Sequence, residues 1–205
     1  MDQTPKEEEK VKSLFEDAYQ NHVNGKLDDA ERTYKKILKL DPNQADTLNN
    51  LGCISYLKDN FKQSLKCLLR LKKIHPDFVE GLNNLGKTYD KLDDIPNAIN
   101  CLKTALDLEP DNEDALVLIG SLLLRSNRAE EAIKCLQYCL KIHPESALVY
   151  HNLSVAYEGQ KKFEHALQAA IQACEKDPAN AAFNVHRLSL ILEKEEKKES
   201  PEEAP

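Results

Sequence analysis

Residues 79–112 read VEGLNNLGKTYDKLDDIPNAINCLKTALDLEPDN, and this stretch decides the fold. Apolar side chains recur every three or four positions in two runs, 82–92 and 95–108. That spacing is typical of amphipathic helices. The two runs are separated by Asp93 and Asp94, residue types that favour turns over helix interiors. The stretch therefore predicts a helical hairpin, meaning two antiparallel helices joined by a short turn.

The same pattern repeats along the chain. Its markers are prolines that stand 34 residues apart: Pro42, Pro76, Pro110, Pro144 and Pro178. Placing each proline at position 32 of a unit predicts five repeats: 11–44, 45–78, 79–112, 113–146 and 147–180. Positions 8 and 20 hold only Ala, Gly or Ser, so the two helices of a hairpin are expected to cross closely there. A fixed period of this length is typical of stacked repeat proteins.

One more helix is predicted over residues 181–195, with Leu188 on its inner side and Arg187 on its outer side. Repeats and final helix form a single predicted domain, residues 11–195. Residues 1–10 and 196–205 are charged, contain proline and hold almost no apolar side chain, so both are expected to be disordered.

The repeat unit resembles a known family. Residues 84–86, Asn-Leu-Gly, with Tyr89, Ala98 and Pro110, resemble the signature of the tetratricopeptide repeats (TPRs), and the likeness extends over residues 11–180. The resemblance implies an all-α, right-handed α-solenoid of stacked antiparallel helix hairpins, with residues 181–195 as the capping helix. It further implies a protein-binding scaffold whose groove is lined by the first, or leading, helix of each repeat.

Composition and charge exclude several classes of function. The net charge is −7, from 28 Lys and Arg against 35 Asp and Glu, which argues against a nucleic-acid partner. The longest near-apolar run, residues 115–124, is too short to span a membrane, and residues 1–12 lack the features of a secretory signal. A cytoplasmic protein is expected. The six cysteines include no CxxC pair, so they are interpreted as buried apolar residues without a metal.

Residues 81–88, GLNNLGKT, match the phosphate-loop pattern GxxxxGK[ST]. That chemistry requires a buried strand before the loop, whereas residues 72–80 contain two lysines, His75 and Pro76. The aligned residues of the other repeats also predict a helix interior. Nucleotide binding by an enzyme is therefore a remote alternative, and no catalytic residue, metal site or cofactor is predicted.

The candidate binding residues are those that the family tends to turn toward the groove. Position 6 carries an incomplete ladder of amides, and an amide can both donate to and accept from a peptide backbone. The full predicted set is Asp46, Asn49, Asn50, Tyr56, Glu80, Asn83, Asn84, Lys87, Val117, Leu118, His151 and Asn152. The expected ligand is an extended or helical segment of a partner protein.

Two questions stay open at the level of sequence. The apolar side chains of residues 117–124 either form an exposed anchor in the groove or pack between repeats. The second alternative function is self-assembly of the chain as a structural scaffold, through its ends or its convex face.

Overall fold

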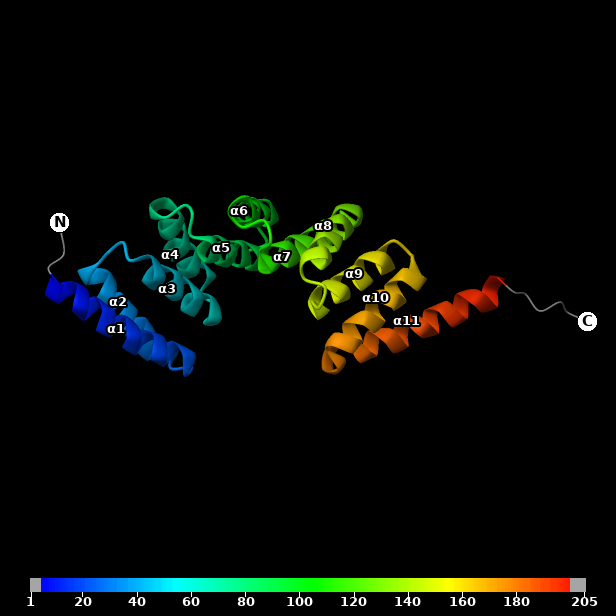
Figure 1. The fold of residues 1–205 in the computed structure, drawn as a ribbon, viewed down its shortest axis with the longest axis horizontal. Helices are drawn as coiled ribbons and strands as arrows, with labels where there is room; N and C mark the ends of the chain where they lie inside the picture. Colours follow the sequence, from blue (N-terminus) through cyan, green and yellow to red (C-terminus); the bar gives the residue numbers. More distant parts are fainter. Residues whose placement is uncertain (1–4, 200–205) are drawn as a thin grey trace, which may run out of the picture. The chain divides into compact units, whose positions relative to one another are not determined.

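The computed structural model describes residues 5–199, and the side chains of residues 6–178 and 184–193. These residues form eleven α helices and no strand. The helices are α1 (Pro5–Val23), α2 (Leu27–Leu40), α3 (Ala45–Leu57), α4 (Phe61–Ile74), α5 (Val79–Lys91), α6 (Ile95–Leu108), α7 (Glu113–Arg125), α8 (Ala129–Ile142), α9 (Ala147–Gly159), α10 (Phe163–Lys176) and α11 (Pro178–Glu199). The all-α prediction is confirmed, and each predicted repeat holds one helix pair (Figure 1).

The helices gather into two compact units, Met1–Pro110 with α1 to α6 and Asp111–Pro205 with α7 to α11. In the first unit, Leu51 and Ile54 of α3 join the buried cluster of the first hairpin. Leu85 of α5 joins Leu68 of α4 in a second cluster. In this unit, α3 and α5 thus each pack on the hairpin before them. The prediction that residues 11–195 form a single domain stays a prediction, because the helices form two compact units.

The turn inside each hairpin begins with a residue of positive φ. These residues are Gly25, Asp59, Asp93, Asn127 and Lys161, with φ of 75°, 55°, 58°, 57° and 59°. A residue in this left-handed conformation ends a helix by letting its N–H bond back into the last turn. Glycine, Asn and Asp adopt it at low cost, whereas Lys161 carries a Cβ that crowds the following carbonyl. The turn predicted at Asp93 and Asp94 is confirmed, since α5 ends at Lys91 and α6 begins at Ile95.

Replacing Lys161 with glycine is expected to raise the free energy of unfolding by about 0.5–1 kcal/mol. The change removes the crowded Cβ, and this gain exceeds the extra chain entropy that glycine gives to the unfolded state. Urea unfolding followed by circular dichroism measures the effect. Asn127→Gly is the matched control and should change stability less, because asparagine already tolerates positive φ. Equal effects of the two substitutions would contradict the argument.

Close helix crossing depends on the small residues at position 8. A Cβ added to Gly52, Gly86 or Gly120 would lie 2.7, 2.8 or 2.6 Å from a leucine side chain of the second helix of the same hairpin. In the fifth hairpin, Ser154 takes this position and its Oγ donates to the carbonyl oxygen of Ala166, at 2.8 Å. The predicted close crossing is thus present, with position 8 against a leucine at position 24 in three hairpins and against position 20 in the fifth.

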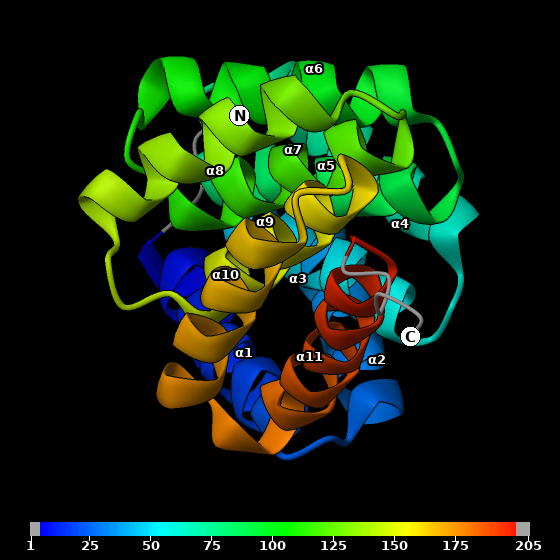
Figure 2. The same cartoon turned by 90° about the vertical axis from the view of Figure 1, so that its right-hand side faces the viewer.

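Helix α11 follows α10 directly and packs against it (Figure 2). It begins at Pro178, three residues before the predicted start, since proline is favoured in the first turn of a helix and lacks only an N–H that would be unpaired there. Leu188 is fully buried against Ala166 and Ala170, as predicted. The expected outward position of Arg187 is wrong. Its guanidinium binds both carboxylate oxygens of Glu158 in α9, with 2.6 Å from Nη2 to Oε2.

The predicted disordered ends are partly helical. Residues 5–10 belong to α1, where glutamates in the first turn favour the positive end of the helix dipole and Val11 is buried. Residues 196–199 continue α11. Residues 1–4 and 200–205 lie outside the described residues, so the prediction for them stays untested.

Candidate functional site

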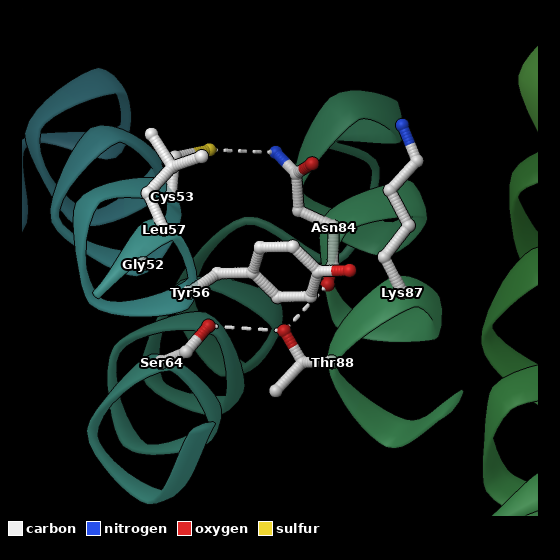
Figure 3. A pocket seen from close by; sticks show the side chains of 8 residues that line it. All are labelled: Gly52, Cys53, Tyr56, Leu57, Ser64, Asn84, Lys87 and Thr88. Atoms are coloured by element: carbon white, nitrogen blue, oxygen red, sulfur yellow. Dashed lines mark hydrogen bonds between the residues drawn. The ribbon is translucent and has the colours of Figure 1, made fainter. Parts of the chain in front are cut away.

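The first unit contains a pocket of about 190 Å³ between α3, α4 and α5 (Figure 3). Its lining residues are Gly52, Cys53, Tyr56, Leu57, Ser64, Asn84, Lys87 and Thr88. Three of them, Tyr56, Asn84 and Lys87, were predicted from the sequence. Cys53 and Leu57 were missed. They occupy positions 9 and 13 of the second repeat, which are among the positions that the family turns toward the groove.

The floor of the pocket is closed by hydroxyl groups that bond to each other. Ser64 Oγ of α4 and Thr88 Oγ1 of α5 lie 2.9 Å apart, and Thr88 Oγ1 also donates to the carbonyl oxygen of Asn84 at 2.7 Å. Both residues are buried. Because these polar groups are satisfied within the protein, the pocket offers a ligand mainly apolar walls.

The carboxamide of Asn84 is held across two repeats. Its Nδ2 donates to Asn49 Oδ1 of α3 at 2.9 Å. It also donates to Cys53 Sγ of the same helix at 3.2 Å (Figure 3). The predicted ladder amide therefore uses its donors inside the protein. What it presents to a ligand is the carbonyl oxygen Oδ1, an acceptor for a backbone N–H.

Charges of both signs surround the thiol of Cys53. Burial raises the pKa of Cys53, the nearby Lys87 ammonium opposes this rise, and the carboxylate of Glu80 adds to it. Cys53 therefore stays a neutral thiol at neutral pH, which makes it a wall of the pocket and not a nucleophile. The aromatic ring of Tyr56 lies across the space between α3 and α5 and packs on Phe61, with ring centroids 5.5 Å apart (Figure 3).

The Asn50 side chain is half-buried. Burial raises the pKa of Tyr34 to about 12, and the Asn50 carboxamide lowers it by a smaller amount. The two groups do not reach hydrogen-bond geometry, and the Tyr34 hydroxyl has no partner among the described residues. Asp46 and Glu80 are exposed, as their predicted place at the rim of the groove requires.

The prediction for position 5 of the repeats is only partly right. Asn83 and Val117 are buried, with 6% and 8% of their surface exposed. Asn49 bonds to Asn84 of the next leading helix, and His151 Nδ1 lies 3.4 Å from Asn184 Nδ2 of α11. Position 5 thus points along the stack toward a neighbouring helix, so Asn83 and Val117 do not present their side chains to a ligand.

The second unit carries apolar side chains on its leading helices. In α9, Leu148 and Val155 are 57% and 43% exposed, and they share a helix face with the half-buried Asn152. In α7, which packs against α9, Leu118 and Leu124 are half-buried. The open question about this region is answered: residues 118 and 124 are partly accessible, Val117 is buried, and α9 adds an exposed apolar surface. We call Leu118, Leu124, Leu148, Asn152 and Val155 the apolar patch.

The phosphate-loop match is a helix interior. Residues 81–88 lie within α5, where the backbone N–H groups bond to the helix itself. No cluster of three metal-ligating side chains occurs among the described residues. Within the same part of the chain, no helix combines the length and apolar character needed to cross a membrane.

The cysteines in the described part of the chain are all free. Cys67, Cys101 and Cys139 are buried, in line with their interpretation as core residues. Cys53, Cys135 and Cys174 are only half-buried.

Comparison with known proteins agrees with the geometry. Two tetratricopeptide-repeat family models match residues 91–153 and 146–176. A search of the curated proteins found no significant match. The crystal structure of MamA protein is 25% identical, with a TM-score of 0.72 over 83% of this chain and 93% of that one.

Two further solved structures share the fold. YrrB, described as a TPR protein with an unusual peptide-binding site, is 22% identical, with a TM-score of 0.69 over 88% of this chain and 90% of that one. A tetratricopeptide repeat protein from Parabacteroides merdae is 18% identical, with a TM-score of 0.77 over 90% of this chain and 74% of that one. The two family models, together with the hairpins, the turn chemistry and the glycine crossings, identify a tetratricopeptide-repeat protein, and the solved structures share its all-α solenoid fold.

Proposed function

We propose that this protein is an interaction scaffold whose leading helices hold an extended or helical segment of a partner protein. The observation that carries the proposal is the pocket between α3 and α5, where apolar walls stand beside the fixed acceptor Asn84 Oδ1. That combination suits a peptide, since the walls take a side chain and the acceptor takes a backbone N–H. YrrB, which shares the fold, is described as having a peptide-binding site.

In the first unit, the pocket takes an uncharged side chain of the partner. About 190 Å³ is enough for one aliphatic or aromatic group, and the floor hydroxyls are already bonded to each other. Lys87 and Glu80 flank the Cys53 thiol with opposite charges, so the rim favours neither sign alone. The exposed carboxylate of Asp46 adds a further negative charge, which favours a basic residue beside the anchor.

In the second unit, the apolar patch supplies a second contact. Leu148 and Val155 are exposed on either side of Asn152, so an apolar partner side chain would bury them while the carboxamide meets the backbone. Interface energy concentrates in a few such desolvated contacts. The partner segment is therefore expected to carry spaced apolar anchors.

The test is selection of binding peptides from a displayed random library with the full chain, followed by affinity measurement on the selected peptide. Replacing Asn50, Asn84 and Asn152 together by Ala is expected to weaken binding by about tenfold or more, because backbone contacts are lost. The control replaces three exposed asparagines, Asn24, Asn43 and Asn100, which lie away from the pocket and the apolar patch. The control should bind as the unchanged chain does, with both variants keeping their helix content.

Two results would contradict the proposal. One is that no peptide is selected by the full chain. The other is that the two triple variants bind the selected peptide equally well, in which case the amide positions contribute nothing.

A further inference from the structure

Helix α4 differs in charge from every other second helix of a hairpin. Its sequence, FKQSLKCLLRLKKI, holds five basic residues and no acidic one. The helices α2, α6, α8 and α10 each carry acidic side chains, although the chain as a whole has a net charge of −7. A concentration of positive charge on one helix of an acidic protein is a local feature that requires its own explanation.

The charges of α4 work against the helix itself. Lys62 lies in the first turn, where the helix dipole disfavours a cation. Lys62, Lys66 and Arg70 follow one another at intervals of four, so like charges are neighbours on the surface. These side chains are exposed and, among the described residues, none of the three makes an ion pair. The stability of α4 does not account for this pattern.

Helix α2 extends the basic surface. Its acidic residues are already bound by cations of the same unit: Asp29 pairs with Arg32, Asp28 with Lys58 at 2.7 Å, and Glu31 with both Lys35 and Lys58. As a result, the pKa of Glu31 is lowered, first by Lys35 and then by Lys58. The remaining cations of α2, Lys36 and Lys39, are exposed and lack such a partner in the part of the chain that the structure describes.

The two helices lie close together. Arg70 Nη2 of α4 donates to the carbonyl oxygen of Pro42, two residues beyond the end of α2, at 2.7 Å. Tyr34 and Ile37 of α2 and Cys67 of α4 belong to one buried cluster, so the exposed faces of the two helices are neighbours. On the exposed face of α4, Leu69 lies one helical turn from both Lys66 and Lys73, and it is 42% exposed although it is apolar. We call Lys36, Lys39, Lys62, Lys66, Leu69, Arg70 and Lys73 the basic face.

We propose that the basic face is a second docking surface, separate from the pocket and the apolar patch, and that it binds an acidic segment of a partner protein with an apolar side chain seated on Leu69. Charge complementarity selects the occupant, because carboxylates of the segment would meet cations that have no counterion among the described side chains. The exposed leucine favours an amphipathic protein segment over a polyanion without apolar groups. The overall acidity of the chain opposes a nucleic acid, whose phosphates need a wider basic surface.

The test measures binding of a fluorescein-labelled peptide, built of glutamates with two leucines one helical turn apart, to the full chain by fluorescence anisotropy. Duplex DNA and phosphatidylserine vesicles serve as the alternative probes. We expect the peptide to bind more tightly than either and the affinity to fall as salt is raised. The variant Lys62→Glu with Lys66→Glu is expected to bind about tenfold more weakly or worse, since two attractive charges become repulsive.

The variant is suited to this test because glutamate in the first turns of α4 is favourable to the helix dipole, so folding should be preserved. The matched control, Lys103→Glu with Lys134→Glu, changes the net charge equally at two exposed sites of α6 and α8 and should keep the affinity within about twofold. Absence of peptide binding, or equal affinities of the two variants, would overturn the proposal. Tighter binding of DNA or vesicles would overturn the assignment to a protein partner. The variant in which Asn50, Asn84 and Asn152 are replaced by Ala leaves the basic face unchanged. A failure of this proposal can therefore be distinguished from a failure of the proposed function.

Discussion

Replacing Leu102 with Ala is expected to lower the free energy of unfolding by about 2–5 kcal/mol. Leu102 is fully buried in α6, and its side chain lies over Gly86 of α5 at the crossing of the third hairpin. Truncation removes the contacts of one isobutyl group and leaves a cavity that the backbone of two crossed helices cannot close. Urea unfolding of the purified chain, followed by circular dichroism, measures the loss.

A second substitution at the same crossing identifies its cause. Gly86→Ala alone should destabilise the protein by about 1–3 kcal/mol, because the new Cβ would lie 2.8 Å from Leu102 and the leucine must shift. In the double variant with Leu102→Ala, that clash is gone, so the two losses should fail to add by about 1 kcal/mol or more. Gly159→Ala, where a Cβ meets nothing within 4 Å, is the control and should not destabilise. Strictly additive losses would mean that the glycine is not required by Leu102.

The hairpins could be predicted because their signals are local and repeated. Turn residues such as Asp59 and Asp93 fix each helix end through their own backbone conformation, and five copies of the pattern confirm one another. The start of α11 was missed because Pro178 stands at position 32 of its repeat. In the four earlier repeats, the proline at this position lies between two helices. The choice between ending one helix and beginning another depends on tertiary packing, here the burial of Leu188 against α10, and not on the proline itself.

The candidate site was predictable in part for a similar reason. The resemblance to the family names Tyr56, Asn84 and Lys87, and these three residues line one pocket. The resemblance does not decide whether position 5 faces solvent or the next helix, because that depends on the rotation between stacked hairpins. Asn83 and Val117 are buried as a result. The hydrogen bond from Asn84 to Asn49 could not be predicted either, because it joins side chains of two different repeats.

Replacing Leu188 with Asp is expected to release α11 from α10. Leu188 is fully buried with Ala166 and Ala170, so the substitution places a carboxylate where the packing offers only apolar neighbours. An unpaired buried charge of this kind costs about 3 kcal/mol or more. In a repeat protein, where an element contacts mainly its neighbours, the loss should be local at first. Hydrogen exchange of the α10 and α11 amides, with urea unfolding, measures it.

The control for this prediction lies on the same helix. Leu190 is 42% exposed, so Leu190→Asp makes the identical chemical change, with the same loss of helix propensity, without burying a charge. Its effect should stay within about 0.5 kcal/mol, and its α11 amides should exchange as slowly as those of the unchanged chain. If both variants speed exchange equally, the effect comes from aspartate within the helix and not from docking. If neither does, α11 is held by the Arg187–Glu158 pair and not by the apolar contact of Leu188, and Arg187→Ala should then release the helix instead.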